Sequence, residues 1–186
     1  MRIIACFGDS LIQGFPFTSE NSWIAEVEKR TGISMMNYGY CGECCDEIRY
    51  RVTSRMIPDG CEHILFLGGM NDLLRKRPVA YILKDMDDAL QWSLEQGFHF
   101  CLVLPWFCEH RELNLKIKQL RNEMTRRFEG KCLLLDFQKV YPAGVQMHAW
   151  FFWDGVHPQS CAYQKMGEYA APILEKWLKD TAPAAS

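Results

Sequence analysis

Apolar residues gather in five short runs of β-strand length, and longer segments with a helical pattern separate these runs. The runs cover Arg2–Phe7, Ser34–Tyr38, His63–Leu67, His99–Leu104 and Lys131–Asp136. The first, third and fourth runs are almost continuously apolar and do not alternate with polar residues. This pattern is typical of strands that are buried on both faces of a sheet.

Between these runs, apolar residues recur at the spacing of helices that bury a single stripe. The clearest stripes are Val79, Ile82, Leu83, Met86 and Leu90, then Leu113, Ile117, Leu120, Met124 and Phe128, and finally Tyr163, Met166, Ala170, Ile173 and Trp177. Shorter helices are predicted over Ser22–Arg30 and Glu43–Arg55. Gly32, Gly97 and Gly130 follow polar helix ends, where a left-handed cap is favoured.

Strands and helices that alternate in this way predict a three-layer α/β/α fold, in which helices cover both faces of a five-stranded parallel sheet. Functional side chains of such folds lie just after the carboxyl ends of the strands. At about 150 residues per domain, the 186 residues correspond to one domain, which we expect to span residues 1–180. The Ala- and Pro-rich segment 181–186 is expected to be frayed.

Composition narrows the function classes. The chain has 21 Lys and Arg against 23 Asp and Glu, so no strong field would concentrate nucleic acid or an anionic membrane. The longest apolar run, Ala149–Trp153, is far shorter than the ~18 residues of a membrane-spanning helix. Nine cysteines, several of them inside apolar runs, suit buried thiols in a reducing compartment. We therefore expect a cytoplasmic protein without nucleic acid as a partner and without stable membrane insertion.

Residues suited to acyl transfer follow the first three predicted strands. Ser10 lies in Gly8-Asp9-Ser10-Leu11, where its hydroxyl would be exposed at the functional edge of the sheet. Asn71, after the third strand, carries an amide that can donate to a developing oxyanion, and the backbone N–H of Gly42 can be a second donor. Each feature also has a plain structural explanation, because Ser and Asn often cap helices and Gly often occupies turns.

A carboxylate and a histidine lie three residues apart near the end of the chain, in Asp154-Gly155-Val156-His157-Pro158. One turn can hold Asp154 against one imidazole nitrogen of His157 while the other nitrogen faces a substrate. Together with Ser10 and two oxyanion donors, this pair completes the parts of an acyl-transfer site, and the coincidence outweighs each separate structural explanation.

Four segments, those around Ser10, Gly42 and Asn71 and the segment 154–158, resemble the four signature blocks of the SGNH hydrolases, also called GDSL esterases and lipases. They follow one another in the same order and with similar spacing, from residue 8 to residue 158. The resemblance implies Ser10 as nucleophile, His157 as base and Asp154 as the residue that orients it. It also implies an oxyanion hole made by the N–H groups of Ser10 and Gly42 and the Asn71 amide. The fold that it implies is flavodoxin-like, with sheet order 2-1-3-4-5. Ser10 does not stand in the G-x-S-x-G motif of the α/β-hydrolases, which disfavours that fold.

The resulting hypothesis is a serine esterase that needs no cofactor and hydrolyses carboxylic esters through an acyl-enzyme on Ser10. Trp106 and Phe107, after the fourth predicted strand, and Trp153, directly before Asp154, are candidates for an apolar substrate pocket, although core packing also explains such rings. Without a separate lid domain, short or medium acyl groups are expected.

Several alternatives stay open. The same residues would serve a thioesterase, a lysophospholipase or a carbohydrate acetylesterase, and a flavodoxin-like binding domain would use the same crevice without turnover. Cys41, Cys44 and Cys45 contain a C-x-x-C spacing, but no second ligand pair accompanies it, so no metal is expected. The other histidines are expected to be structural or solvated, and the basic run Arg75-Lys76-Arg77 to be a solvated loop that could meet an anionic group. The physiological substrate and the oligomeric state are not determined by these patterns.

Overall fold

The computed structural model describes residues 2–54, 57–141 and 148–182, in which strands and helices alternate along the chain. The strands are β1 (Ile3–Gly8), β2 (Ser34–Gly39), β3 (His63–Leu67), β4 (His99–Val103) and β5 (Leu133–Leu135). The α-helices are α1 (Ser10–Gln13), α2 (Trp23–Thr31), α3 (Cys45–Thr53), α4 (Met70–Leu74), α5 (Val79–Glu95), α6 (Arg111–Phe128) and α7 (Ser160–Asp180), and two 3₁₀ helices are η1 (Ser19–Asn21) and η2 (Phe137–Lys139).

All strand pairs are parallel, and the sheet order is β2-β1-β3-β4-β5, as the resemblance implied. The three almost continuously apolar runs became β1, β3 and β4, which are the strands flanked on both sides by a neighbour. Cys6 in β1 pairs with Leu65 in β3, which in turn pairs with Cys101 in β4. Burial on both faces explains why these strands lack polar alternation.

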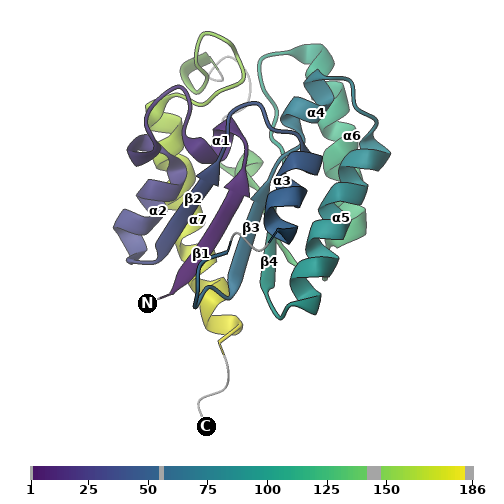
Figure 1. The fold of residues 1–186 in the computed structure, drawn as a ribbon. Coiled ribbons are helices and arrows are strands. Elements are labelled where there is room, and N and C mark those ends of the chain that lie inside the picture. Colours follow the sequence, from purple (N-terminus) through teal and green to yellow (C-terminus); the bar gives the residue numbers. More distant parts are fainter. Residues whose placement is uncertain (1, 55–56, 142–147, 183–186) are drawn as a thin grey trace.

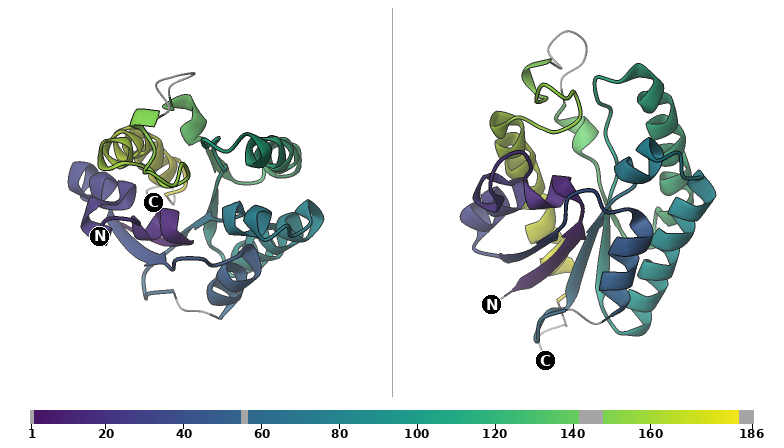
Figure 2. Two further views of the ribbon diagram at one scale, coloured as in Figure 1. Left: turned by 90° about the horizontal axis from the view of Figure 1, so that it is seen from above. Right: turned by 45° about the horizontal axis from the view of Figure 1, so that its top comes forward.

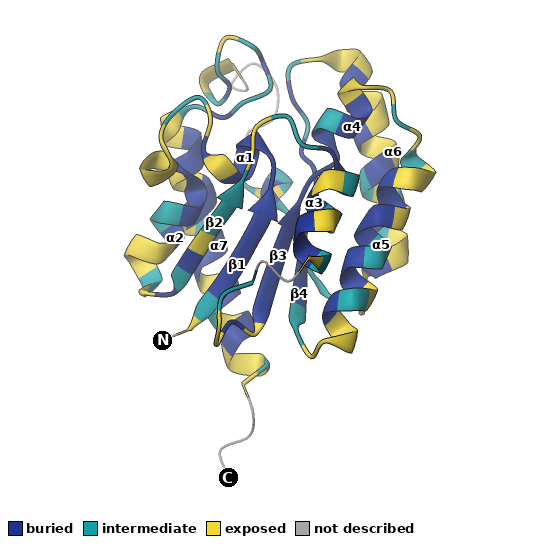
Figure 3. Ribbon diagram, viewed as in Figure 1, coloured by how far each residue is buried: buried dark blue, intermediate teal, exposed yellow. Residues whose placement is uncertain are grey.

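Helices cover both faces of the sheet. α2 and α7 pack against each other on one face, while α3, α5 and α6 cover the other face (Figures 1 and 2). The buried positions lie along the strands and the inner sides of the helices, and the exposed positions lie on the outer sides (Figure 3). The predicted three-layer α/β/α class is therefore confirmed.

Local capping explains where the helices end. The Ser22 hydroxyl accepts a hydrogen bond from the Ala25 N–H at 3.2 Å and begins α2. Gly32, which follows α2, has φ 69°, and Gly97 and Gly130 also have positive φ, as predicted for left-handed caps. The short helices α1 and α4 were not predicted, because each is only one turn long and has no stripe to read from the sequence.

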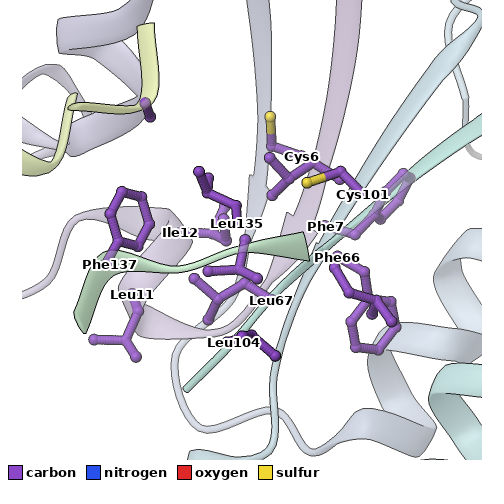
Figure 4. Close-up of a cluster of buried hydrophobic side chains, with 14 of the residues drawn as sticks. Cys6, Phe7, Leu11, Ile12, Phe66, Leu67, Cys101, Leu104, Leu135 and Phe137 are labelled. Atoms are coloured by element: carbon purple, nitrogen blue, oxygen red, sulfur yellow. The ribbon is translucent and has the colours of Figure 1, made fainter. Parts of the chain in front are cut away.

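The core lies between the sheet and the helices. Leu11 and Ile12 from α1 point into the same cluster as Leu67, Leu135 and Phe137 (Figure 4). All nine cysteines fall within the described residues and all are free thiols; Cys6, Cys44, Cys45, Cys61, Cys101 and Cys108 are buried. The expectation of buried thiols holds for these six.

The chain end is partly fixed to the body. The Thr181 hydroxyl is 2.7 Å from His63 Nε2 and donates to the Trp177 carbonyl at 2.7 Å, so the first residue of the expected frayed segment is held in place. Residues 183–186 of that segment lie outside the described part. In residues 2–182, apart from the two internal gaps, no helix has the length and apolar character needed to cross a bilayer.

Candidate active site

The turn after β1 places Ser10 at the carboxyl edge of the sheet. Gly8 allows this turn, because a Cβ there would lie 2.4 Å from Ile12 Cγ1 and 2.7 Å from the Leu67 carbonyl oxygen. Asp9 caps α1, since its Oδ1 accepts a hydrogen bond from the Leu11 N–H at 2.9 Å. Ser10 is consequently the first residue of a helix whose next two side chains are anchored in the core.

Ser10, His157 and Asp154 form a continuous hydrogen-bonded relay. Ser10 Oγ is 2.9 Å from His157 Nε2, and His157 Nδ1 is 2.7 Å from Asp154 Oδ2. The Ser10–His157 contact joins the start of α1 to the loop before α7, across 147 residues of sequence. The three residues therefore have the mutual geometry of a nucleophile, a base and an orienting carboxylate.

A local turn fixes the Asp154 carboxylate. Its Oδ1 accepts hydrogen bonds from the N–H groups of Val156 and His157, both at 2.9 Å. Partial desolvation acts to raise the pKa of Asp154, but these two N–H groups and the His157 ring outweigh it and hold the pKa below its usual range. The carboxylate thus stays ionised and keeps the His157 ring oriented.

The loop that carries Asp154 and His157 docks against the segment after β4. His110 Nε2 is 2.8 Å from the Asp154 carbonyl oxygen, and the Glu109 N–H donates to the Gly155 carbonyl at 2.9 Å. His110 was expected to be structural or solvated, and the structure places it in direct contact with the triad loop. Its position just after β4, at the same edge as Ser10, was the signal that could have identified it.

The two residues proposed as oxyanion donors lie on neighbouring loops. Gly42 has φ 83°, and among the described residues its N–H has no hydrogen-bond acceptor. Asn71 Nδ2 donates to the Glu43 carbonyl at 2.9 Å and lies 3.4 Å from Asp9 Oδ2. The first bond fixes the amide against the Gly42 loop, whereas the second is long for a hydrogen bond.

Arg51 in α3 ties this loop to the sheet, a role that the sequence patterns did not indicate. It donates through Nη1 to the Tyr38 carbonyl at 2.7 Å, through Nη2 to the Gly8 carbonyl at 3.1 Å, and through Nε to the Glu43 carboxylate at 2.9 Å. The side chain is buried among these partners and its guanidinium lies 4.7 Å from the Tyr40 ring centre. Arg51 therefore links the ends of β1 and β2 to Glu43, whose carbonyl accepts the hydrogen bond from the Asn71 amide.

Two buried carboxylates lie beneath the site. Asp9 is 1% exposed and Asp72 is fully buried. Burial raises the pKa of Asp9 to about 7, and Asp72 and Glu43 add to the effect, against the lowering influence of the Leu11 N–H. Asp72 accepts hydrogen bonds from the Cys45 N–H at 3.0 Å and from Arg77 Nη1 at 2.8 Å.

The cysteines beside Gly42 do not form a convincing metal centre. Cys44, Asp46 and Asp72 offer ligand atoms within 4.8 Å of one another. However, Arg77 Nη1 lies 2.8 Å from Asp72 and 3.7 Å from Asp46, so a guanidinium already neutralises these carboxylates. Burial and the nearby Asp72 raise the pKa of the Cys44 thiol to about 11, which disfavours the thiolate that a metal requires.

The aromatic residues expected to line a pocket have different positions. Trp106 is 1% exposed and packs in the core, with its ring 5.7 Å from those of Phe137 and Tyr141. It therefore does not line an open pocket, because its strand-end loop turns inward. Phe107 is half-buried beside Arg121, and Trp153 is 86% exposed. A ring that does contact the His157 side chain is Phe15, whose centre lies 4.7 Å from that of His157.

Comparison with known proteins finds similarity in structure but not in sequence. The sequence matches no protein-family model and no curated protein. A protein described as a lipolytic member of the G-D-S-L family, from Desulfitobacterium hafniense, superposes with a TM-score of 0.84 at 21% identity, covering 93% of this chain and 99% of that chain. A member of the lipolytic G-D-S-L family from Veillonella parvula gives 0.83 at 21% identity, covering 95% and 100%.

The psychrotrophic esterase EstA from a Pseudoalteromonas species gives a TM-score of 0.78 at 16% identity, with 96% of this chain and 100% of that chain covered. At identities of 16–21% such matches establish a shared fold. The similarity to GDSL proteins expected from the sequence is thus confirmed for the fold over nearly the whole chain. This chain has the three-layer α/β/α fold of the GDSL, or SGNH, lipolytic proteins and esterases.

Proposed function

We propose that the protein is a serine esterase that hydrolyses carboxylic esters through an acyl-enzyme on Ser10. The observation that carries this proposal is the relay in which Ser10 Oγ lies 2.9 Å from His157 Nε2 and His157 Nδ1 lies 2.7 Å from Asp154 Oδ2. A binding domain has no need of a base aimed at a serine hydroxyl, so the relay favours catalysis over binding alone.

The reaction proceeds in two halves. His157 takes the Ser10 proton as the oxygen attacks the ester carbonyl, and the imidazolium then gives this proton to the departing alcohol. In the second half, His157 takes a proton from a water molecule as the water attacks the acyl-enzyme, and the imidazolium returns this proton to Ser10 Oγ as the acid leaves. Asp154 keeps the ring oriented and stabilises its positive charge, as its low pKa supports.

The negative charge on the carbonyl oxygen is held by the N–H groups of Ser10 and Gly42 and by the Asn71 amide. The contact between Asn71 Nδ2 and Asp9 Oδ2 is long, at 3.4 Å, so an oxyanion can replace it while the bond to Glu43 keeps the amide in place. Each such donor is worth about 3 kcal/mol in the transition state.

Short or medium acyl groups fit the surroundings of the relay best. Phe15 is 40% exposed beside His157, and Trp153, next to Asp154, is 86% exposed. Rings presented to solvent in this way contact part of a chain without enclosing it. We expect the rate to peak at acyl chains of no more than about twelve carbons, since an open apolar surface adds ~0.8 kcal/mol only for each CH₂ that it actually covers.

The first test is an assay of the wild type and Ser10→Ala with p-nitrophenyl esters from acetate upward. Loss of the nucleophile should lower kcat by ~10⁴-fold or more, whereas Ser160→Ala, an exposed serine at the start of α7, should leave kcat unchanged. A fluorophosphonate probe should label Ser10 in the wild type, as mass spectrometry of peptides would detect.

Equal activity of the wild type and Ser10→Ala, or labelling at another residue, would rule out Ser10 as nucleophile. Thioesters of the same acyl groups, assayed in parallel, separate an esterase from a thioesterase. A wild type that neither turns over esters or thioesters nor reacts with the probe would contradict the proposal and favour a binding domain.

A further inference from the structure

The basic run Arg75-Lys76-Arg77, which follows α4, sends its three side chains to different places. Arg77 turns inward and pairs with Asp72 at 2.8 Å and Asp85 at 2.7 Å. Arg75 lies against the loop that carries Gly42, called the oxyanion loop below, and its Nη2 donates to the Gly42 carbonyl at 2.9 Å. Lys76 lies on the surface next to a cavity. The run is therefore not simply a solvated loop: Arg77 is held inward, whereas Lys76 and Arg75, whose side chain is 61% exposed, reach the surface.

Lys76 has a backbone conformation that a lysine rarely adopts. Its φ is 60°, the left-handed region, and among the described non-glycine residues no other has a positive φ. The neighbouring hydrogen bonds hold it there, because the Lys76 N–H donates to the Leu73 carbonyl at 3.1 Å and the Arg77 N–H to the Asp72 carbonyl at 2.8 Å. These two bonds form the Schellman cap of α4, in which the residue after the C-cap takes the left-handed conformation. The cap fixes the point from which the Lys76 side chain leaves the backbone.

The cavity beside Lys76 lies between α4 and the start of α6, with a volume of about 340 Å³. Its apolar walls are Leu73 and Leu74 from α4 and Leu113 from α6; its rim is formed by Lys76, His110, Arg111, Glu112 and Lys116. Three of the rim residues are basic side chains and one is a carboxylate. Within the described part of the chain, Lys76, Arg111 and Lys116 make no ion pair with any acid, so their charge is available to a ligand.

Both walls of the cavity belong to elements that also reach the candidate active site. α4 carries Asn71 one turn before Leu74, and His110 contacts the Asp154 carbonyl oxygen at 2.8 Å. α4 and α6 lie side by side at the end of the molecule toward which the strands point (Figure 1). Arg75 adds a further cation on the oxyanion loop, 3.8 Å from where a Gly42 side chain would begin.

We propose that this cavity binds an anionic group, carboxylate or phosphate, that the ester substrate carries at the end of a short apolar chain. The apolar walls would take the chain, and Lys76, Arg111 and Lys116 would meet the anion. This inference rests on the proposed esterase function and deepens it by naming the substrate class. Each exposed charge pair adds only a modest preference, so it takes the three cations together to select between otherwise similar esters.

The test compares esters that differ only in the anion. The hemi-ester mono-4-nitrophenyl suberate places a carboxylate at the end of the chain, and 4-nitrophenyl octanoate is its neutral counterpart. For the wild type we expect kcat/KM to favour the suberate, mainly through a lower KM, and the preference to fall when salt rises from 0.05 to 0.5 M. A third substrate, 1-octanoyl-glycerol 3-phosphate, tells whether a phosphate on the alcohol side is preferred instead.

The double substitution Lys76→Met and Lys116→Met keeps the aliphatic stems and removes two charges. It should lower the suberate-to-octanoate ratio of kcat/KM by about tenfold. Lys118→Met, an exposed lysine of α6 that does not line the cavity, is the matched control and should leave the ratio unchanged. A wild-type ratio near one, or a ratio that the double variant does not change, would overturn the inference even if neutral esters are hydrolysed.

A binding measurement keeps the inference separate from the proposed reaction. Calorimetric titration of the wild type with octanedioate should show binding that the double variant lacks and that octanoate does not match. Binding of this kind without ester turnover would remove the esterase proposal and leave the anion site. Turnover of neutral esters without octanedioate binding would remove the anion site and leave the esterase proposal.

Discussion

At the scale of single residues, Asn71 is the proposed oxyanion donor whose side chain the structure positions most sharply. Its amide is fixed by the 2.9 Å bond to the Glu43 carbonyl, and its long second contact faces Asp9. Asn71→Ala should lower kcat by about 100-fold while KM changes little, because the donor acts mainly on the transition state. Steady-state kinetics with a p-nitrophenyl ester would measure both constants.

The control for this substitution is Asn122→Ala, an exposed asparagine of α6, which should have wild-type kinetics. Circular dichroism of both variants should match the wild type. If Asn71→Ala lowers kcat by less than threefold, Asn71 is not part of the oxyanion hole.

At the scale of elements, Arg51 carries α3 against the ends of β1 and β2. Its guanidinium donates to the Tyr38 and Gly8 carbonyls and to Glu43 at the same time, which a single lysine ammonium cannot reproduce. Arg51→Lys should therefore loosen the loop of Gly42 and Glu43, to which the Asn71 amide is bonded. We expect kcat to fall about tenfold or more. KM should change far less, because the residue acts on the oxyanion donors and not on substrate contacts.

Arg49→Lys is the matched control in the same helix, where Arg49 pairs with Asp85 at 3.0 Å away from the oxyanion loop. It should retain wild-type kcat. Thermal unfolding of both variants shows whether the assay temperature lies well below the transition. If Arg51→Lys has wild-type kcat there, Arg51 is only a structural residue.

At the scale of the whole molecule, the free energy of unfolding should depend on the ionisation of Asp9. Burial raises its pKa from 3.8 to about 7 in the folded protein, so the folded state binds a proton that the unfolded state has released. This contribution to stability is complete below pH 3.8 and is lost as the pH rises through about 7. Urea unfolding of the wild type and Asp9→Asn at several pH values would measure the effect.

The free energy of unfolding of the wild type, relative to Asp9→Asn, should fall by up to ~1.4 kcal/mol per pH unit within that window. The lowered pKa of Asp154 has the opposite sign, because its stabilisation is lost as the pH falls; it is common to both proteins and cancels. Ser10→Ala retains Asp9 and should follow the wild type. Parallel curves for the wild type and Asp9→Asn would contradict the prediction.

The strands and longer helices could be predicted from local sequence patterns, because the faces that a strand or helix buries determine where its apolar residues occur. Continuous apolar runs marked β1, β3 and β4, and single stripes marked α5, α6 and α7. The sequence also placed Asp154 and His157 one turn apart, so their 2.7 Å contact depends on neighbouring residues alone. These strands, helices and the turn from Asp154 to His157 depend on residues close together in the chain, so a sequence pattern is enough to predict them.

Contacts between distant segments were decided only by the tertiary structure. The bonds of Arg51 and His110 and the cavity beside Lys76 join segments far apart in the chain, and no sequence pattern predicted them. The order of the strands and the meeting of Ser10 with His157 were expected only from the family resemblance, and not from periodicity or spacing. Trp106 showed the same limit, since a strand-end position does not determine whether a ring turns toward a pocket or into the core. Spacing along the sequence specifies local geometry, whereas the packing of helices on the sheet determines which side chains meet across it.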